Sequence, residues 1–234
     1  MSTEHVYLAL MLDAPLMSFG HSSRFQRRTT ALHPTRSGIL GMICAALGAA
    51  KGSSVESEWL ARLDGARLTV LAIPRRPDGA REPLPIRRLD DYHTVEGTRN
   101  AENKIKKDAV LSHRQYLLDA RFGAIMEGPR AVLEPVADAL RNPHWGIWFG
   151  RKCCIPAAPV FRKLAATFDE AMATLDLASR DLAEFAVVTE APSFDEGTDT
   201  LMDAPVSFAT REFKPRRICQ TPPVVPPGER RVTA

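Results

Sequence analysis

Residues 37–48, SGILGMICAALG, form an apolar stretch of small residues that begins with a serine and ends with a glycine. Serine is favoured at the start of a helix and glycine just after its end, so these bounds predict a helix with a Ser37 cap. Upstream, the sequence HVYLALML at His5–Leu12 is β-prone and apolar, and residues 15–20 predict the turn that ends it. The chain is therefore expected to open with a strand followed by a helix.

The same kinds of element recur further along the chain. Arg67–Ile73 (RLTVLAI) predicts a second strand, which Pro74 ends, and β-prone residues return at Arg114–Glu127. Apolar residues at helical spacing predict a helix at Ala131–Arg141, and Trp145–Phe149 (WGIWF) predicts a fourth strand. The order β-α-β-β-α-β is typical of an α+β protein with an RRM or ferredoxin-like fold. The antiparallel sheet of this fold leaves one face free to meet RNA.

A long polar segment separates the second predicted strand from the third. Residues 76–113 are rich in Pro, Arg and Lys and poor in core material, so we expect an insertion that projects from the body. Residues 1–155 then form the RRM-like domain with its insertion. Residues 156–234 are expected to be a C-terminal extension, with a helix near 167–178 and a strand at 184–189. This extension ends in a Pro-rich tail that we expect to be mobile.

Composition excludes several classes of protein. A hydrophobic fraction of 44% and a charged fraction of 25% are those of an ordinary globular domain. No apolar run reaches the roughly 18 residues of a membrane helix, so no membrane contact is expected. The four cysteines contain no CxxC pair, the six histidines no HxxxH or HExxH spacing, and the chain no Walker loop. We therefore predict no metal, no cofactor and no nucleotide hydrolysis, and we expect a cytoplasmic protein.

The cationic residues are clustered, although the net charge is only +3. Residues 14–55 contain five cationic side chains and no Asp or Glu. Residues 75–88 contain five arginines against two acids, and residues 211–217 contain four cations against one acid. Clusters of this kind create a local positive potential that can hold a phosphate backbone. They could equally be solvated faces.

Two short segments are candidate phosphate sites. Arg36-Ser37-Gly38 is expected in the first helical turn, where free amides, a hydroxyl and a guanidinium could bind an anion. Gly38 could instead allow close packing on the sheet. Gly150–Pro156 (GRKCCIP) follows the fourth predicted strand, so its Arg and Lys could contact phosphates at a sheet edge. We expect Cys153 in this segment to be a buried structural cysteine.

Two further segments combine aromatic, imidazole and cationic groups. They are Asp90–Thr94 (DDYHT) and His113–Tyr116 (HRQY). Their tyrosines and histidines could stack on bases or bind phosphates. They could also cut RNA without a metal, since His, Lys and Tyr can act as general acid, general base and electrostatic stabiliser. Alternatively, the tyrosines cap the sheet and the histidines are ordinary surface residues.

Five segments together resemble the CasD family, the fifth-numbered Cas subunit of type I-E Cascade. They lie in the expected order and cover most of the first 160 residues. The segments are Ala14–Gly20 (APLMSFG), Pro34–Gly48 (PTRSGILGMICAALG), Asp91–Thr94 (DYHT), Tyr116–Phe122 (YLLDARF) and Gly150–Pro159 (GRKCCIPAAP). They are similar to the family patterns GPLQSWG, PTKSGxLGLLAAALG, DYHT, YLxDAxF and GRKxCxPxxP. The sequence departs from the family by having Met17 for Gln, Phe19 for Trp and Arg36 for Lys.

This resemblance implies an RRM-like body with a protruding thumb, which would be the insertion at 76–113. It also implies a non-catalytic subunit that binds the 5′ handle of crRNA beside the large subunit CasA and the first backbone subunit CasC. Such a subunit would meet target DNA only indirectly, through the complex, in antiviral defence. The runner-up is a metal-independent endoribonuclease that processes pre-crRNA, as the I-C relatives do. The expected RNA contacts are Arg24, Arg27, Arg36, Ser37, Gly38, Tyr92, His93, Arg114, Tyr116, Arg151 and Lys152.

Overall fold

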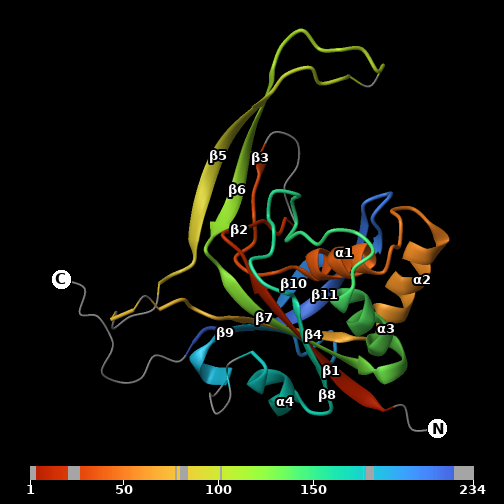
Figure 1. The fold of residues 1–234 in the computed structure, drawn as a ribbon, viewed down its shortest axis with the longest axis vertical. Helices are drawn as coiled ribbons and strands as arrows, with labels where there is room; N and C mark the ends of the chain where they lie inside the picture. The colour runs from red at the N-terminus through yellow and green to blue at the C-terminus, as the bar shows by residue number, and fades with distance from the viewer. Residues whose placement is uncertain are drawn as a thin grey trace.

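The computed structural model describes residues 4–20, 27–76, 78–79, 84–100, 102–175, 177 and 182–223. Its largest element is a seven-stranded antiparallel sheet in the order β10-β11-β9-β4-β7-β1-β8 (Figure 1). The strands are β1 (His5–Asp13), β4 (Arg67–Ala72), β7 (Arg121–Pro129), β8 (Phe161–Ala165), β9 (Ala186–Glu190), β10 (Asp199–Ser207) and β11 (Glu212–Thr221). The protein is therefore α+β, with a large antiparallel sheet and few helices. No helix in the described part of the chain is long and apolar enough to cross a membrane.

The predicted first strand is confirmed as β1, which is buried on both faces. Leu8 and Leu10 pack into the larger hydrophobic core with the helices of one side. Ala9 and Met11 point to the opposite side and pack into a second core. Because successive side chains of a strand face opposite sides of the sheet, two covered faces require a continuous apolar run rather than alternation. The sequence HVYLALML has this pattern.

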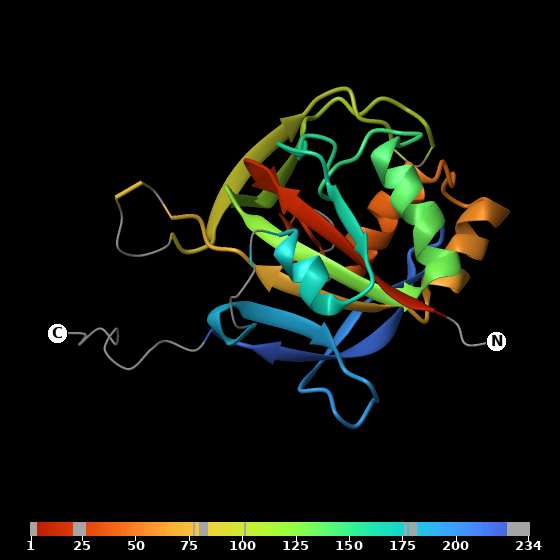
Figure 2. The ribbon, with the colours of Figure 1, turned by 60° about the horizontal axis from the view of Figure 1, so that its bottom comes forward.

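Helices cover both faces of the sheet (Figure 2). On one face lie α1 (Arg36–Ala46), α2 (Ser54–Leu63) and α3 (Arg130–Arg141), and on the other lies the short α4 (Phe168–Ala173). The predictions of α1 and α3 are confirmed. The cap of α1 is Thr35 rather than Ser37, because the Thr35 hydroxyl accepts a hydrogen bond from the Gly38 amide (3.2 Å). Helix α2 was not predicted, and α4 ends well before residue 178.

Two strand predictions are corrected. Trp145–Phe149 is not a strand, because its backbone bonds to the end of α1 and to a local turn: the Trp145 amide donates to Ala45 and the Phe149 amide to Cys154. The strand that follows α3 and pairs with β1 is β8 instead. The β-prone stretch at residues 114–127 is two strands, interrupted at Asp119, whose φ of 48° is left-handed.

The C-terminal segment continues the main sheet. The strand predicted at 184–189 is found as β9, which pairs with β4, and the unpredicted hairpin β10–β11 follows beside it. Lys214 and Arg216 of the cationic cluster at 211–217 pair with acids, which neutralises two of its four cations. Of the Pro-rich tail, residues 224–234 lie outside the described residues.

A second, four-stranded sheet is built around a long hairpin. Strand β5 (Arg87–Val95) pairs with β6 (Val110–Leu118) over nine residues, and β6 also pairs with β2 (Leu16–Met17) and β3 (Arg27–Arg28). Figure 1 shows the β5–β6 hairpin extending away from the seven-stranded sheet. The polar segment predicted to project from the body forms most of this hairpin.

Candidate nucleic-acid interface

Cations from three separate segments meet at the base of the β5–β6 hairpin. Strand β3 runs parallel to β6, which places Arg27 beside His113 and Arg28 beside Arg114. The loop after residue 149 lies against the same two strands. Arg151 of this loop donates to the backbone carbonyls of residues 115 and 28, both at 3.1 Å. The structure therefore brings Arg28, Arg114 and Arg151 together, whereas Arg27 is in register with His113 and lies on the other face of the strand.

We call the cations Arg27, Arg28, Arg114, Arg151 and Lys152 the basic cluster. Among the described residues, no carboxylate lies within 4.0 Å of a charged nitrogen of any of them. Cations elsewhere differ in this respect, since Arg87 pairs with Asp119 at 2.9 Å and Arg130 with Glu4 at 2.8 Å. These cations are therefore not neutralised by contact ion pairs and can attract an external anion, although Asp91 lies opposite Arg114 in the hairpin.

Arg151 and Tyr116 form a stacked pair. The guanidinium carbon of Arg151 lies 4.5 Å from the centroid of the Tyr116 ring, and Tyr116 is only 6% exposed. The Cys153 thiol approaches the Tyr116 hydroxyl at 3.7 Å. This ring is buried and packs against the Arg151 guanidinium, so the base stacking expected of Tyr116 is wrong. Because Arg151 has further N–H groups besides its two carbonyl contacts, it can still bind a phosphate.

The loop that carries Arg151 and Lys152 is fixed by its backbone. Gly150 has a left-handed φ of 93°, and a Cβ at this position would collide with the Ser18 carbonyl. The Ser18 amide also donates to Phe149 at 3.0 Å, which ties the loop to the turn after β1.

The two neighbouring cysteines have different environments. Cys153 is exposed, which corrects the expectation of a buried residue, whereas Cys154 is fully buried. Burial raises the pKa of the Cys154 thiol to about 11, which keeps it protonated and inert.

One face of the hairpin carries an aromatic pair. Tyr92 of β5 lies opposite His113 of β6, and their ring centroids are 5.0 Å apart. Tyr92 is 57% exposed, so its ring remains available to a base. Arg27, in register with His113, belongs to this face as well. The expected stacking position of Tyr92 is therefore compatible with the structure.

The other face carries a second set of polar groups. His93 lies opposite Ser112, and Asp91 lies opposite Arg114, one position along from the aromatic pair. The His93 Nδ1 atom is 3.5 Å from a carboxylate oxygen of Asp91. Because side chains alternate between the faces of a strand, His93 and His113 point to opposite sides of the hairpin.

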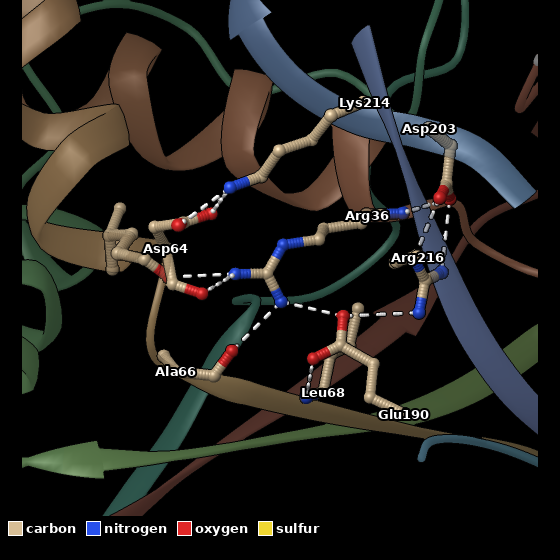
Figure 3. Close-up of polar contacts among 9 residues, drawn as sticks. Arg36, Asp64, Ala66, Leu68, Glu190, Asp203, Lys214 and Arg216 are labelled. Atoms are coloured by element: carbon tan, nitrogen blue, oxygen red, sulfur yellow. Dashed lines mark hydrogen bonds and ion pairs between the residues drawn. The ribbon is translucent and has the colours of Figure 1, made fainter. Parts of the chain in front are cut away.

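Arg36 is not at the interface, and its expected phosphate contact is wrong. It is 3% exposed, and its guanidinium donates to the backbone carbonyls of Leu63 (2.7 Å), Asp64 (3.0 Å) and Ala66 (2.8 Å) (Figure 3). It also pairs with Glu190 Oε1 at 2.6 Å. The protein itself therefore occupies the donors that were expected to meet RNA.

The start of α1 is also occupied. The Arg36 amide donates to Asp203 Oδ2 at 2.8 Å, so a carboxylate from β10 fills the anion position at this helix terminus. Arg216 of β11 bonds both oxygens of Asp203, at 2.6 and 3.0 Å, and reaches Glu190 at 3.1 Å. We call Arg36, Glu190, Asp203 and Arg216 the buried ion network. It joins the first helix to the C-terminal strands.

Ser37 and Gly38 belong to the same packed region. The Ser37 hydroxyl lies 3.2 Å from that of Thr35, which also accepts from the Gly38 amide. A Cβ at residue 38 would lie 2.8 Å from the Phe19 ring, so Gly38 is needed for packing rather than for access to a ligand. No phosphate seat is formed by Arg36, Ser37 and Gly38.

The other site residues are Arg24, Arg28 and His113. Arg24 lies outside the described residues. Arg28 belongs to the site but was not among the expected contacts, and His113 was considered for stacking or phosphate binding but not included in the final set. The adjacency of Arg28 to Arg27 and of His113 to Arg114 was the available signal. Within the described ranges, no group of three or more His, Cys, Asp or Glu residues is arranged to hold a metal ion.

Comparisons with known proteins identify the family of the chain. Residues 7–219 match the family described as CRISPR-associated protein (Cas_Cas5). The chain is 28% identical over 214 residues to the CRISPR system Cascade subunit CasD of Escherichia coli (strain K12), covering 88% of this chain and 94% of that protein. A chain of a solved CRISPR RNA-guided surveillance complex is 27% identical and superposes with a TM-score of 0.70 over 95% of each chain. A crystal structure of a Cas protein is 25% identical, with a TM-score of 0.62 over 93% of this chain and 98% of that one. The present chain therefore belongs to the CRISPR-associated Cas_Cas5 family.

Proposed function

We propose that this protein is the subunit of a type I-E CRISPR surveillance complex that binds the 5′ handle of crRNA at the base of its β5–β6 hairpin. The meeting of Arg28, Arg114 and Arg151 from three segments, with no ion pair to a carboxylate among the described residues, carries this proposal. The similarity to a Cascade subunit and to a chain of an RNA-guided surveillance complex supports it.

In this proposal the two kinds of group have separate tasks. Arg27, Arg114, Arg151 and Lys152 bind phosphates of a bent single strand. Tyr92 stacks on a base that is splayed out of the strand, because unpaired RNA presents its bases to aromatic rings. His93 makes a polar contact on the opposite face.

The fold suits this role. The strand order β4-β7-β1-β8 with α1 and α3 on one face is the order expected of an RRM-like unit, and the β5–β6 hairpin would be its thumb. We further propose that CasA and CasC are the neighbouring subunits and that target DNA is met through the complex. The protein would act in the cytoplasm, where crRNA is made.

We propose a non-catalytic role. Cleavage of a phosphodiester by paired imidazoles needs both of them at one phosphate, as general base and general acid. His93 and His113 lie on opposite faces of the hairpin, which argues against such a pair. The alternative endoribonuclease role remains testable, because it requires cutting of a repeat RNA by the purified protein in EDTA.

The experiment measures handle RNA binding against salt concentration. We expect Arg114→Ala and Lys152→Ala each to flatten the slope of log K against log salt by about 0.7, the value for one phosphate contact on a single strand. Lys163→Ala is the control, because this half-exposed lysine lies on β8, an edge strand of the other sheet, and faces Glu170. Unchanged slopes in both variants would refute the proposed site. Cutting of the RNA by excess protein in EDTA would favour the endoribonuclease.

A further inference from the structure

The connection between β9 and β10, residues 191–198 (APSFDEGT), presents an exposed aromatic ring. We call it the 191–198 loop. Phe194 is 65% exposed, the largest exposed fraction of any large apolar side chain in the described ranges. In Figure 2 this loop projects below the sheet, on the side away from the β5–β6 hairpin. The loop is therefore remote from the proposed RNA site.

Hydrogen bonds from Arg217 and within the loop order the 191–198 loop. Arg217 of β11 donates from Nε to the Phe194 carbonyl at 2.8 Å and also donates to the Gly197 carbonyl. Its guanidinium carbon lies 5.2 Å from the Phe194 ring centroid. The Ser193 hydroxyl donates to Glu196 at 2.8 Å. An ordered loop loses little conformational entropy when it binds, which is the condition for an effective interface anchor.

The acidic residues around the Phe194 ring argue against a nucleic-acid partner. Asp195 and Glu196 follow Phe194 directly and are exposed, and Asp199 is exposed at the start of β10. The nearby cation, Arg217, directs its donors inward to the loop backbone and to Thr200. An acidic rim of this kind repels phosphates and attracts Lys and Arg side chains.

We propose that the 191–198 loop docks into another protein subunit of the same ribonucleoprotein complex. Phe194 enters an apolar pocket of that subunit, and Asp195 and Glu196 face Lys or Arg side chains on the pocket rim. Exposed aromatic residues that become buried at the centre of an interface carry much of its binding energy. The proposal rests on the proposed function only in that the partner is sought within that complex.

The test uses the complete complex, reconstituted from this protein, crRNA and the other subunits. We expect Phe194→Ser to weaken association with the complex by about 30-fold or more, the loss typical of a central anchor residue. Glu196→Lys should weaken association most at low salt. Val55→Ser is the matched control, because Val55 is 45% exposed on α2 and outside the loop. Association is measured by native mass spectrometry with titrated protein, and thermal melting checks that each variant is folded.

Handle RNA binding by the isolated protein is measured in parallel. Unchanged RNA affinity with lost association is the expected result for Phe194→Ser. Association like that of the wild type in both loop variants would overturn the inference, as would an equal loss of RNA affinity. If the wild-type protein bound no handle RNA but the loop variants still dissociated from the complex, the proposed RNA role would fall and the docking loop would stand.

Discussion

Replacement of Arg36 by alanine should lower the free energy of unfolding of the protein without affecting its RNA contacts. The substitution removes the guanidinium that bonds the carbonyls of Leu63, Asp64 and Ala66. It also removes the 2.6 Å pair with Glu190, which is itself only 11% exposed. Buried acceptors that lose their donor keep the full cost of desolvation.

The magnitude follows from the geometry of the buried ion network. Removing one partner of a buried ion pair costs about 3–5 kcal/mol. Arg216 still reaches Glu190 at 3.1 Å, so part of the negative charge stays compensated and we expect the lower end, about 3 kcal/mol. For a domain of this size each kcal/mol lowers Tm by about 2–4 °C. The expected fall in Tm is therefore roughly 6–12 °C.

Calorimetry and RNA titration together show whether Arg36 stabilises the fold or binds a phosphate. Arg67→Ala is the control, because Arg67 is 51% exposed and pairs with Glu127 at the surface, where a pair contributes less than about 1 kcal/mol. We expect Arg36→Ala to lower Tm while the salt slope for handle RNA stays that of the wild type at temperatures where the variant is folded. A wild-type Tm combined with a flatter slope would refute the buried role and restore Arg36 as a phosphate ligand.

Two further predictions concern the loop that carries the RNA-binding cations. Gly150→Ala should cost more than about 2 kcal/mol and weaken RNA binding, because the left-handed φ and the carbonyl against residue 150 leave no room for a Cβ. Gly65→Ala, with open space around its Cα, should leave urea unfolding unchanged, and equal stabilities of the two variants would contradict this reasoning. Iodoacetamide at pH 9 should label Cys153 in the native protein but not Cys44 or Cys154, since burial raises their thiol pKa values to about 12 and about 11. At pH 9 their thiolate fraction is then on the order of 1% or less, and mass mapping of rapid native-state labelling at either residue would disprove the burial.

Several elements could be predicted because their signals are local. The apolar run of β1, the small-residue helix α1 and the apolar spacing of α3 each need only neighbouring residues to be recognised. The sequence predicted the residues at the base of the β5–β6 hairpin only in separate segments and did not show how they lie relative to one another. Register between β3 and β6 decides that Arg27 lies beside His113 and Arg28 beside Arg114, and register is a tertiary property.

The wrong and missed strand predictions concern segments whose structure depends on residues distant in the sequence. Trp145–Phe149 has the composition of a strand, but its amides find partners at the end of α1 and in the adjacent turn, so no ladder forms. The hairpin β10–β11 was missed because its polar residues hide the pattern: Asp203 and Arg216 are buried as a pair rather than exposed. A buried ion pair looks, residue by residue, like a solvated surface.

By itself the sequence determined the family, the strand and helix that begin the fold, and the clustering of cations near the candidate site. Only the tertiary structure decided which cations face outward. Arg36 and Arg151 are both arginines, and the sequence predicted an RNA contact for each of them. Strands from the other end of the chain bring carboxylates to Arg36, whereas the partners of Arg151 among the described residues are carbonyls and an aromatic ring. The physical reason is that a charge is satisfied by whatever lies within a few ångströms of it, and for these residues those neighbours are far away in sequence.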